Sequence, residues 1–358
     1  MATRRRFLAG LLATGALPKP GWAEAGNPSY ISAAKMPGGA YRLFGLDSDG
    51  RPVFSVPLPG RGHAATAHPH RPETVAFARR PGTFAVILDC STGGVTASLA
   101  SPEGRHFMGH GVFSQDGRYL FTPENDYGAG RGVIGVWDAA KDYARAGEFP
   151  SAGIGPHDVA LMPDGNVLVV ANGGIDTHPD SGRAKLNLPT MKPNLAYLDL
   201  SGGVLETVEL APELHHNSIR HLSLRADGLV AFAMQWEGDP DVVAPILGLH
   251  RRGETPSLLS RETAEQSRMD GYGASVSFSG DGRSVAVSSS HGGLVHVYDA
   301  ASGAFDWEFA AADVSGLSAQ GEGLLATTGT GGIFMLGRNE VLAGNREALA
   351  WDNHIVRI

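Results

Sequence analysis

The sequence has little of what identifies several common protein classes. Its 358 residues include a single cysteine, Cys90, which excludes an internal disulfide framework. Charged residues make up only 18% of the chain and the formal net charge is −8. This balance argues against nucleic acid as a partner, since a nucleic-acid-binding protein needs a basic face. No segment after the N-terminal region is long and apolar enough to span a bilayer, so the sequence predicts no integral membrane segment.

The N-terminus carries the features of an export signal. Arginines at positions 4–6 precede an apolar stretch at 8–17, and Ala23, Glu24 and Ala25 form a small-residue cleavage site. This order of basic, apolar and cleavable regions is typical of secretory signals, and the paired arginines indicate the twin-arginine pathway. The sequence therefore predicts a signal peptide at residues 1–25, one folded domain at 26–358, and a location in the periplasm.

Glycine, in contrast, is abundant, with 49 residues that indicate many tight turns. One pattern recurs: an apolar strand, an Asp-Gly turn, a second strand, a loop, a third strand and a polar edge strand. The Asp-Gly pairs stand at 116–117, 164–165, 227–228 and 281–282. Repeats begin near residues 63, 110, 157, 219, 274 and 314, most often about 47 residues apart. This spacing fits four-stranded blades and predicts an all-β, seven-bladed β-propeller.

The two ends of the chain predict how the ring closes. The first segment after the signal offers only three strands, near 30–34, 41–46 and 52–58, and lacks a first strand. Residues 353–358 have the pattern of an isolated first strand. We therefore expect the C-terminal strand to complete the N-terminal blade, which leaves the ring without an open edge.

Histidines recur where the innermost strands of the predicted blades begin. They are His63, His110, His157 and His354. First strands of a propeller begin on one face, so these rings are expected at one mouth of the central channel. Neutral imidazoles suit Zn, Cu, Fe or Ni. Carboxylates and a further histidine from a long polar insertion at 172–187 could complete the shell as a lid, through Asp176, His178 and Asp180.

Two other interpretations of the same face remain open. In one, the histidines act with other polar groups to bind an anionic or sugar-like ligand, or as acid and base. The candidates for ligand binding are Arg220, Arg183, Glu124, Asn172, Gln235 and Tyr272. In the other, each histidine only bonds the backbone and holds neighbouring blades together.

Several longer motifs resemble the bacterial domain-of-unknown-function family fifteen-thirteen. They lie at 109–114 (GHGVFS), 155–157 (GPH), 171–180 (ANGGIDTHPD), 185–188 (KLNL), 218–222 (SIRHL) and 250–253 (HRRG). The resemblance covers almost the whole chain after the signal. It implies an exported, propeller-like protein whose genes lie near imelysin-type iron-uptake proteins and di-haem oxidoreductases. This sequence departs from the family pattern at Ser315, a position where the resemblance implies that relatives often have cysteine.

Three functions follow as hypotheses. The first is a periplasmic binding protein with a His-rich site at the channel mouth, associated with iron or copper and with periplasmic iron-uptake or haem proteins as partners. The second is a lactonase-like hydrolase on the same face, with Glu124 or Glu237 as the carboxylate. The third is an interaction scaffold for periplasmic metal or haem proteins.

Overall fold

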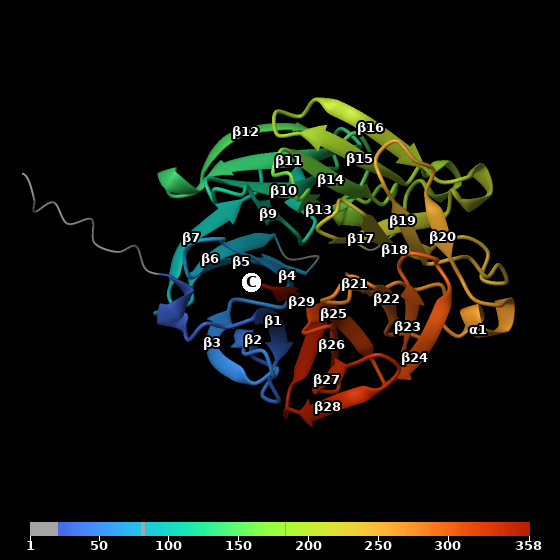
Figure 1. Cartoon of the computed structure of the whole chain (residues 1–358). Coiled ribbons are helices and arrows are strands. Elements are labelled where there is room, and N and C mark those ends of the chain that lie inside the picture. The colour runs from blue at the N-terminus through green and yellow to red at the C-terminus, as the bar shows by residue number, and fades with distance from the viewer. Residues whose placement is uncertain (1–20, 80–82, 183) are drawn as a thin grey trace, which may run out of the picture.

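Six four-stranded sheets and one five-stranded sheet stand in a ring around a central channel (Figure 1). The computed structural model describes residues 21–79, 83–182 and 184–358. In each sheet the strands run antiparallel, and the first strand lies beside the channel (Figure 1). The all-β, seven-bladed propeller expected from the repeats is confirmed. Most of the predicted signal peptide lies outside the described residues.

Each blade begins with a strand beside the channel and continues outward to an edge strand. The first blade has β29 (Ala350–Arg357), β1 (Tyr30–Lys35), β2 (Tyr41–Leu46) and β3 (Pro52–Leu58). The second has β4 (Gly62–Ala67), β5 (Glu73–Ala78), β6 (Phe84–Asp89) and β7 (Val95–Ala100). The third has β8 (Arg105–Phe107) and β9 (Val112–Phe113), then β10 (Tyr119–Asp126), β11 (Arg131–Asp138) and β12 (Ala144–Pro150). The fourth has β13 (Pro156–Leu161), β14 (Val167–Asn172), β15 (Asn194–Asp199) and β16 (Val204–Glu209).

The remaining three blades follow the same plan. The fifth has β17 (Asn217–Leu224), β18 (Val230–Trp236), β19 (Leu247–His250) and β20 (Ser257–Leu259). The sixth has β21 (Ser275–Phe278), β22 (Ser284–Ser289), β23 (Leu294–Asp299) and β24 (Phe305–Ala310). The seventh has β25 (Val314–Gln320), β26 (Gly323–Thr328), β27 (Gly332–Leu336) and β28 (Val341–Arg346).

Helical segments are short and lie in the connections. They are η1 (Trp22–Ala25), η2 (Ala139–Lys141), η3 (Pro179–Ser181), η4 (Leu188–Thr190), η5 (Pro212–Leu214) and α1 (Thr263–Ser267). Among the described residues, no helix has the length and apolar character that crossing a membrane requires. The indole of Trp22 donates to the carbonyl of His68, so η1 contacts the propeller.

The core lies in the wedges between blades. Seven apolar clusters occur among the described residues, and each joins side chains from two neighbouring blades. The middle strands are covered on both faces, which explains why β14 is buried along its whole length and reads as an apolar run. The outermost strand β16 alternates between exposed and half-buried residues. Packing between blades therefore fixes the ring and the channel that it encloses.

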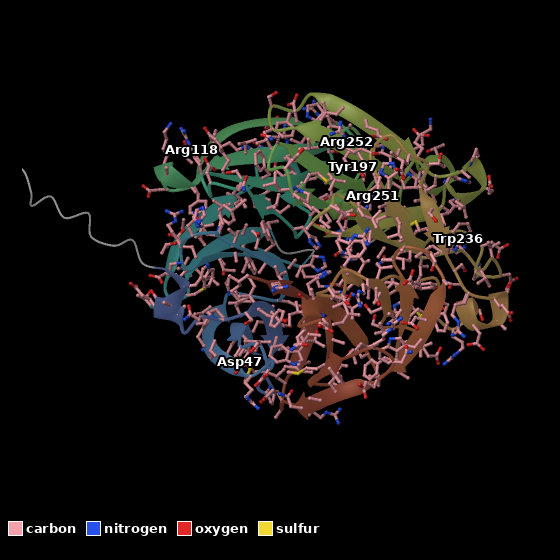
Figure 2. The ribbon with its side chains drawn as sticks, viewed as in Figure 1. Asp47, Arg118, Tyr197, Trp236, Arg251 and Arg252 are labelled. Atoms are coloured by element: carbon pink, nitrogen blue, oxygen red, sulfur yellow. The ribbon has the colours of Figure 1, made fainter. Side chains whose placement is uncertain are left out.

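Polar contacts add to this packing on the outer side of the wedges. Between the fourth and fifth blades, the Tyr197 hydroxyl lies 2.7 Å from Nδ1 of His250. The guanidinium of Arg252 lies 5.9 Å from the centre of the Tyr197 ring. Figure 2 shows Tyr197, Arg251 and Arg252 close together in this part of the ring.

The ring closes as the two chain ends predict. β29 pairs antiparallel with β1, with Tyr30 opposite Arg357. The hydroxyl of Ser32 donates to the carbonyl of His354 at 2.8 Å, and both residues are buried. The Asp-Gly turns also form as expected, with Gly117, Gly165, Gly228 and Gly282 all at positive φ.

Candidate metal centre

Five histidine rings converge in the channel, each from a different blade. His63 lies on β4, His157 on β13, His221 on β17 and His354 on β29. His110 lies in the link between β8 and β9. Neighbouring ring centroids are 4.6–5.5 Å apart, and we call these five residues the histidine cage.

Irregular backbone positions the cage. β4 and β13 each carry a bulge where their histidine stands. Bulges re-aim side chains and are common beside functional sites. In the third blade the inner strand is interrupted, and Gly109 at φ 99° leads into His110. A Cβ on Gly109 would lie 2.3 Å from the His63 ring, so only glycine lets these two segments approach.

Two overlapping sets of three rings have the geometry of metal ligands. They are His63, His110 and His157, and His110, His221 and His354. In each set the ligand nitrogens lie within 4.8 Å of one another. Nε2 of His110 is 3.2 Å from Nε2 of His63. Two nitrogens on a tetrahedral metal with bonds of about 2.0–2.1 Å would be about 3.3 Å apart. The spacing fits two ligands of one ion as well as the hydrogen bond that these two nitrogens form in the structure.

Four nitrogens of the cage are buried and lack a hydrogen-bond partner among the described residues. They are Nδ1 of His63, His157 and His221, and Nε2 of His354. A buried polar atom without a partner costs roughly 1–3 kcal/mol. Four such atoms in one channel, each on a group that ligates metals well, make the cage a candidate ligand site.

Protonation of four of the cage histidines is unfavourable in the folded protein. Burial, followed by the neighbouring histidines, lowers the pKa of His63 and His354 well below the usual value of 6.5. Burial likewise lowers the pKa of His157 and His221, and Arg220 adds to the effect on both. His63 and His157 keep some exposed surface, but they stand in a narrow channel lined by other imidazoles, so their charged forms are still poorly solvated. Neutral rings with free lone pairs are the form that binds a metal.

Asp158 orients His110 from outside the cage. Its Oδ1 lies 3.3 Å from Nδ1 of His110, and its Oδ2 accepts a hydrogen bond from the backbone of Leu222. A carboxylate at Nδ1 favours the tautomer that carries its proton there and leaves the Nε2 lone pair free. Carboxylate–histidine pairs of this kind commonly support metal ligands.

Arg220 and His221 show what the sequence alone could not resolve. Arg220 aligns with the other strand starts in the sequence, which makes it a candidate for ligand binding. The structure places it beside the cage, buried, with its guanidinium 3.3 Å from Glu237. A bulge between Ile219 and His221 makes Arg220 the extra residue, and His221 joins the cage. The sequence signal is the adjacent pair Arg220 and His221 in this repeat. Only the bulge determines which of the two side chains enters the cage.

The insertion at 172–187 contacts residues beside the cage through Lys185, which was not among the residues expected to form a lid. Lys185 pairs with Glu237, which also holds Arg220. His178 lies instead against Tyr127, with ring centroids 4.9 Å apart, and its Nδ1 accepts from the backbone of Asp180. Asp176, His178 and Asp180 belong to none of the metal-compatible groups found in the described part of the chain. Arg183 lies outside the described residues.

Three further candidates lie in polar contacts around the ring. Asn172 is buried and bonds Ser151 and Asn194. Gln235 bonds the carbonyl of Gly273. Tyr272 stacks on His291, with centroids 3.9 Å apart, at the channel mouth.

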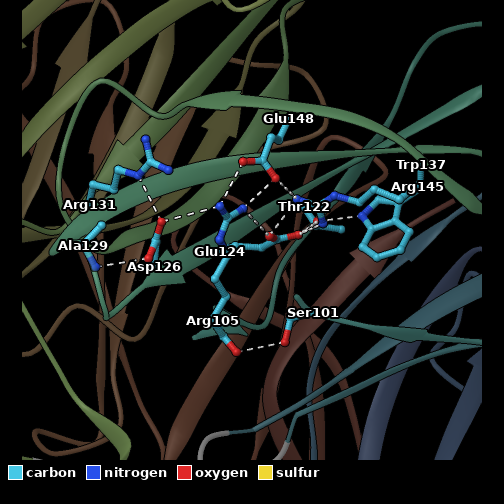
Figure 3. Close-up of polar contacts among 10 residues, drawn as sticks. All are labelled: Ser101, Arg105, Thr122, Glu124, Asp126, Ala129, Arg131, Trp137, Arg145 and Glu148. Carbon is cyan, nitrogen blue, oxygen red and sulfur yellow. Dashed lines mark hydrogen bonds and ion pairs between the residues drawn. The ribbon is translucent and has the colours of Figure 1, made fainter. Parts of the chain in front are cut away.

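Glu124 occupies an ion-pair network inside the third blade. Figure 3 shows its carboxylate between Arg145 and Thr122, which in turn accepts from the Trp137 indole. Arg145 donates at 2.5 and 3.0 Å, and Glu124 is fully buried. Its polar partners all come from its own blade. The structure therefore gives Glu124 a structural setting and does not bring it to the cage.

Replacing Glu124 with glutamine is expected to lower the free energy of unfolding by about 2 kcal/mol. The substitution removes one charge from a buried, bidentate pair and leaves Arg145 with less compensation. Copper affinity should stay unchanged, because none of these contacts reaches the cage. Chemical denaturation and a metal titration on the same preparation test both statements. A stable variant that loses copper would instead tie Glu124 to the metal centre.

Comparisons with known proteins agree with the fold and assign the family. The structure resembles a chain of Kuenenia stuttgartiensis hydrazine synthase, with 13% identity, a TM-score of 0.59, and coverage of 94% of this chain and 99% of that one. It also resembles a chain in the crystal structure of a mitotic checkpoint complex, with 12% identity, a TM-score of 0.53, and coverage of 83% and 78%. These likenesses support the propeller fold alone. A search of curated proteins gave no match. The profile described as "Protein of unknown function (DUF1513)" matches residues 56–358, so the chain belongs to that family, as its motifs indicate.

Proposed function

We propose that the protein binds a transition metal ion, copper in preference to others, in the histidine cage. The single observation that carries this proposal is the convergence of five imidazoles with four unpartnered buried nitrogens. A metal ion bound by the rings would satisfy some of these nitrogens, whereas His63 faces His110 through Nε2 and its Nδ1 would stay unpartnered. A purely structural role predicts the opposite, namely rings already paired with backbone groups.

The chemistry of the donors favours copper over iron. The two sets of potential ligands in the described residues contain histidines alone, and the carboxylate of Asp158 contacts His110 at Nδ1, whereas His63 lies against its Nε2. For a given set of nitrogen ligands, affinity rises from Fe²⁺ to Cu²⁺ and falls again at Zn²⁺. Arg79 and Arg220 contribute positive charge near the rings, which also disfavours ions of higher charge.

The exported location belongs to the same proposal. The arginines at 4–6, the apolar stretch and the small-residue site support export by the twin-arginine route, which carries folded proteins. A folded propeller could thus receive its metal before or after export. We place the protein in periplasmic copper or iron handling, with a metal or haem protein as the partner that gives or takes the ion.

Metal titration of chelator-treated protein tests the proposal. We expect one tightly bound copper ion per chain, zinc bound more weakly and Fe²⁺ more weakly still. Bound copper should raise the melting temperature, because a ligand present at 100 times its Kd stabilises the folded state by about 2.7 kcal/mol. No binding of copper, zinc or iron by folded protein would overturn the proposal, and iron bound more tightly than copper would overturn the choice of metal.

The other two hypotheses gain less support. For a hydrolase, Glu124 is enclosed in its blade and Glu237 is paired with both Arg220 and Lys185. A propeller fold agrees with a binding or scaffold role in general, but it names no partner.

A further inference from the structure

A second feature of the channel mouth is a cavity of about 360 Å³ beside the cage. It is built by the first, second, sixth and seventh blades, three of which contribute a charged side chain. The lining residues used below are Lys35, Arg61, Arg79, Tyr272, His291, Asp313, Trp351 and Asp352. A volume of this size accommodates a small organic molecule and is at the lower end for ligand pockets.

Two arginines are held side by side in this cavity by one carboxylate. Nε of Arg61 donates to Asp352 at 3.0 Å, and Arg79 donates to the same carboxylate at 3.3 Å. Asp352 itself is only 6% exposed. Each guanidinium has five N–H donors, so both retain donors beyond those that Asp352 accepts. Planar guanidinium groups match carboxylates, which they bind with two parallel hydrogen bonds.

The cavity carries more positive than negative charge. Lys35, Arg61 and Arg79 are three cations, whereas Asp313 and Asp352 are two carboxylates. Its walls also suit an organic ligand. The ring of Tyr272 stacks nearly parallel on His291, at 14° and 3.9 Å, and so offers a flat surface. Trp351 is 3% exposed and its indole N–H lacks an acceptor among the described residues.

The cavity adjoins the cage through shared segments. Arg61 precedes His63 by two residues on the way into β4, and Asp352 precedes His354 by two residues on β29. The charge of Arg79 acts on both His63 and His354. A metal ion in the cage would be ligated by imidazoles alone, with Asp158 as a carboxylate in contact with one of them, and a buried charge with too little counter-charge is costly.

We infer that the mouth cavity binds a small organic dicarboxylate between Arg61 and Arg79, next to the metal. One carboxylate pairs with the arginines, and the ligand adds negative charge beside the cage. The second half of this inference rests on the proposed function, whereas carboxylate binding itself does not require the metal. The inference defines the cavity as a ligand site distinct from the cage.

Calorimetry on metal-free protein with malonate as the probe tests the site. We expect saturable binding of one malonate, weakened about ten- to hundredfold by Arg79→Gln, because a charge-assisted pair is lost. Arg79→Lys should recover only part of the affinity, since it keeps the charge but not the planar fork. Arg283→Gln is the matched control, because Arg283 follows an Asp-Gly turn outside the cavity and its side chain is 79% exposed. Malonate that does not bind, or that binds all variants equally, would overturn the inference.

Two further measurements sharpen the result. Asp352→Asn should bind malonate more tightly, since it removes the carboxylate that competes for the arginines, and weaker binding would contradict the assignment. Phosphate at equal ionic strength should bind more weakly than malonate, and equal or tighter binding would overturn the choice of a carboxylate. Failure of the copper titration with intact malonate binding would remove the metal proposal and leave this site standing. The reverse outcome would remove only the carboxylate site.

Discussion

Substituting His110 with alanine is expected to lower copper affinity by about 100-fold or more, the largest effect of any single change in the cage. His110 is the ring common to both sets of potential ligands, so its loss weakens each of them. A factor of 100 corresponds to about 2.8 kcal/mol of binding free energy. Competition with a copper chelator of known affinity measures the change directly.

His178→Ala provides the matched control for His110→Ala. His178 is also a histidine on the same side of the propeller, but it lies against Tyr127 in the insertion. Copper affinity should be unchanged in this variant. Asp158→Asn should lower copper affinity about tenfold or more, because Asp158 orients His110 and does not itself bind the ion. Loss of copper in His178→Ala with normal binding in His110→Ala would move the metal site from the cage to the insertion.

The metal-free protein is expected to lose stability steeply as the pH falls below about 6.5. Four cage histidines have folded-state pKa values well below the ordinary 6.5, mainly through burial. Below pH 6.5 the unfolded chain therefore takes up protons that the folded chain refuses. Each such group lowers the free energy of unfolding by about 1.4 kcal/mol per pH unit, so four together approach roughly 5 kcal/mol per unit. Denaturant unfolding between pH 7.5 and 5.5 measures the slope.

A variant isolates the contribution of the cage to this slope. Other buried histidines also have lowered pKa values, to about 4 for His68 and His296, and they add to the total. His221→Gln should reduce the slope by about 1.4 kcal/mol per unit. His178→Gln, at a half-buried position outside the cage, is the control variant. An identical slope in wild type and His221→Gln would show that the cage accepts protons in the folded state.

The fold could be predicted from the sequence because its signals are local and repeated. Asp-Gly turns such as 116–117 and 281–282 fix hairpins, and their spacing fixes the blade length. The closure by β29 could also be predicted, since an unpaired first strand at one end of the chain matches a missing one at the other. Neither inference needs the exact direction of any side chain.

The site could be predicted only in part, because it depends on strand irregularities. Counting back from the turns finds His63 and His157, the isolated C-terminal strand supplies His354, and the offset of His110 corresponds to a break between β8 and β9. The same count selects Arg220, whereas a bulge brings His221 into the cage. Glu124 looks available on a second-to-third strand loop, but Arg145 and Arg105 from neighbouring strands surround it. A one-residue bulge or a cross-strand ion pair leaves almost no mark on the local sequence.

Closure of the ring by β29 gives the metal a role in holding the chain ends together. His354 comes from the last strand and shares a set of potential ligands with His110 of the third blade, so an ion held by that set joins points 354 − 110 = 244 residues apart. A cross-link that closes so long a loop restricts the unfolded chain strongly. Separating β29 from β1 would remove His354 from the ion, and removing the ion would leave β29 held by its pairing with β1 and its packing alone. Metal release and ring opening are thus thermodynamically linked. A partner that displaces the C-terminal strand would also weaken the binding of the metal.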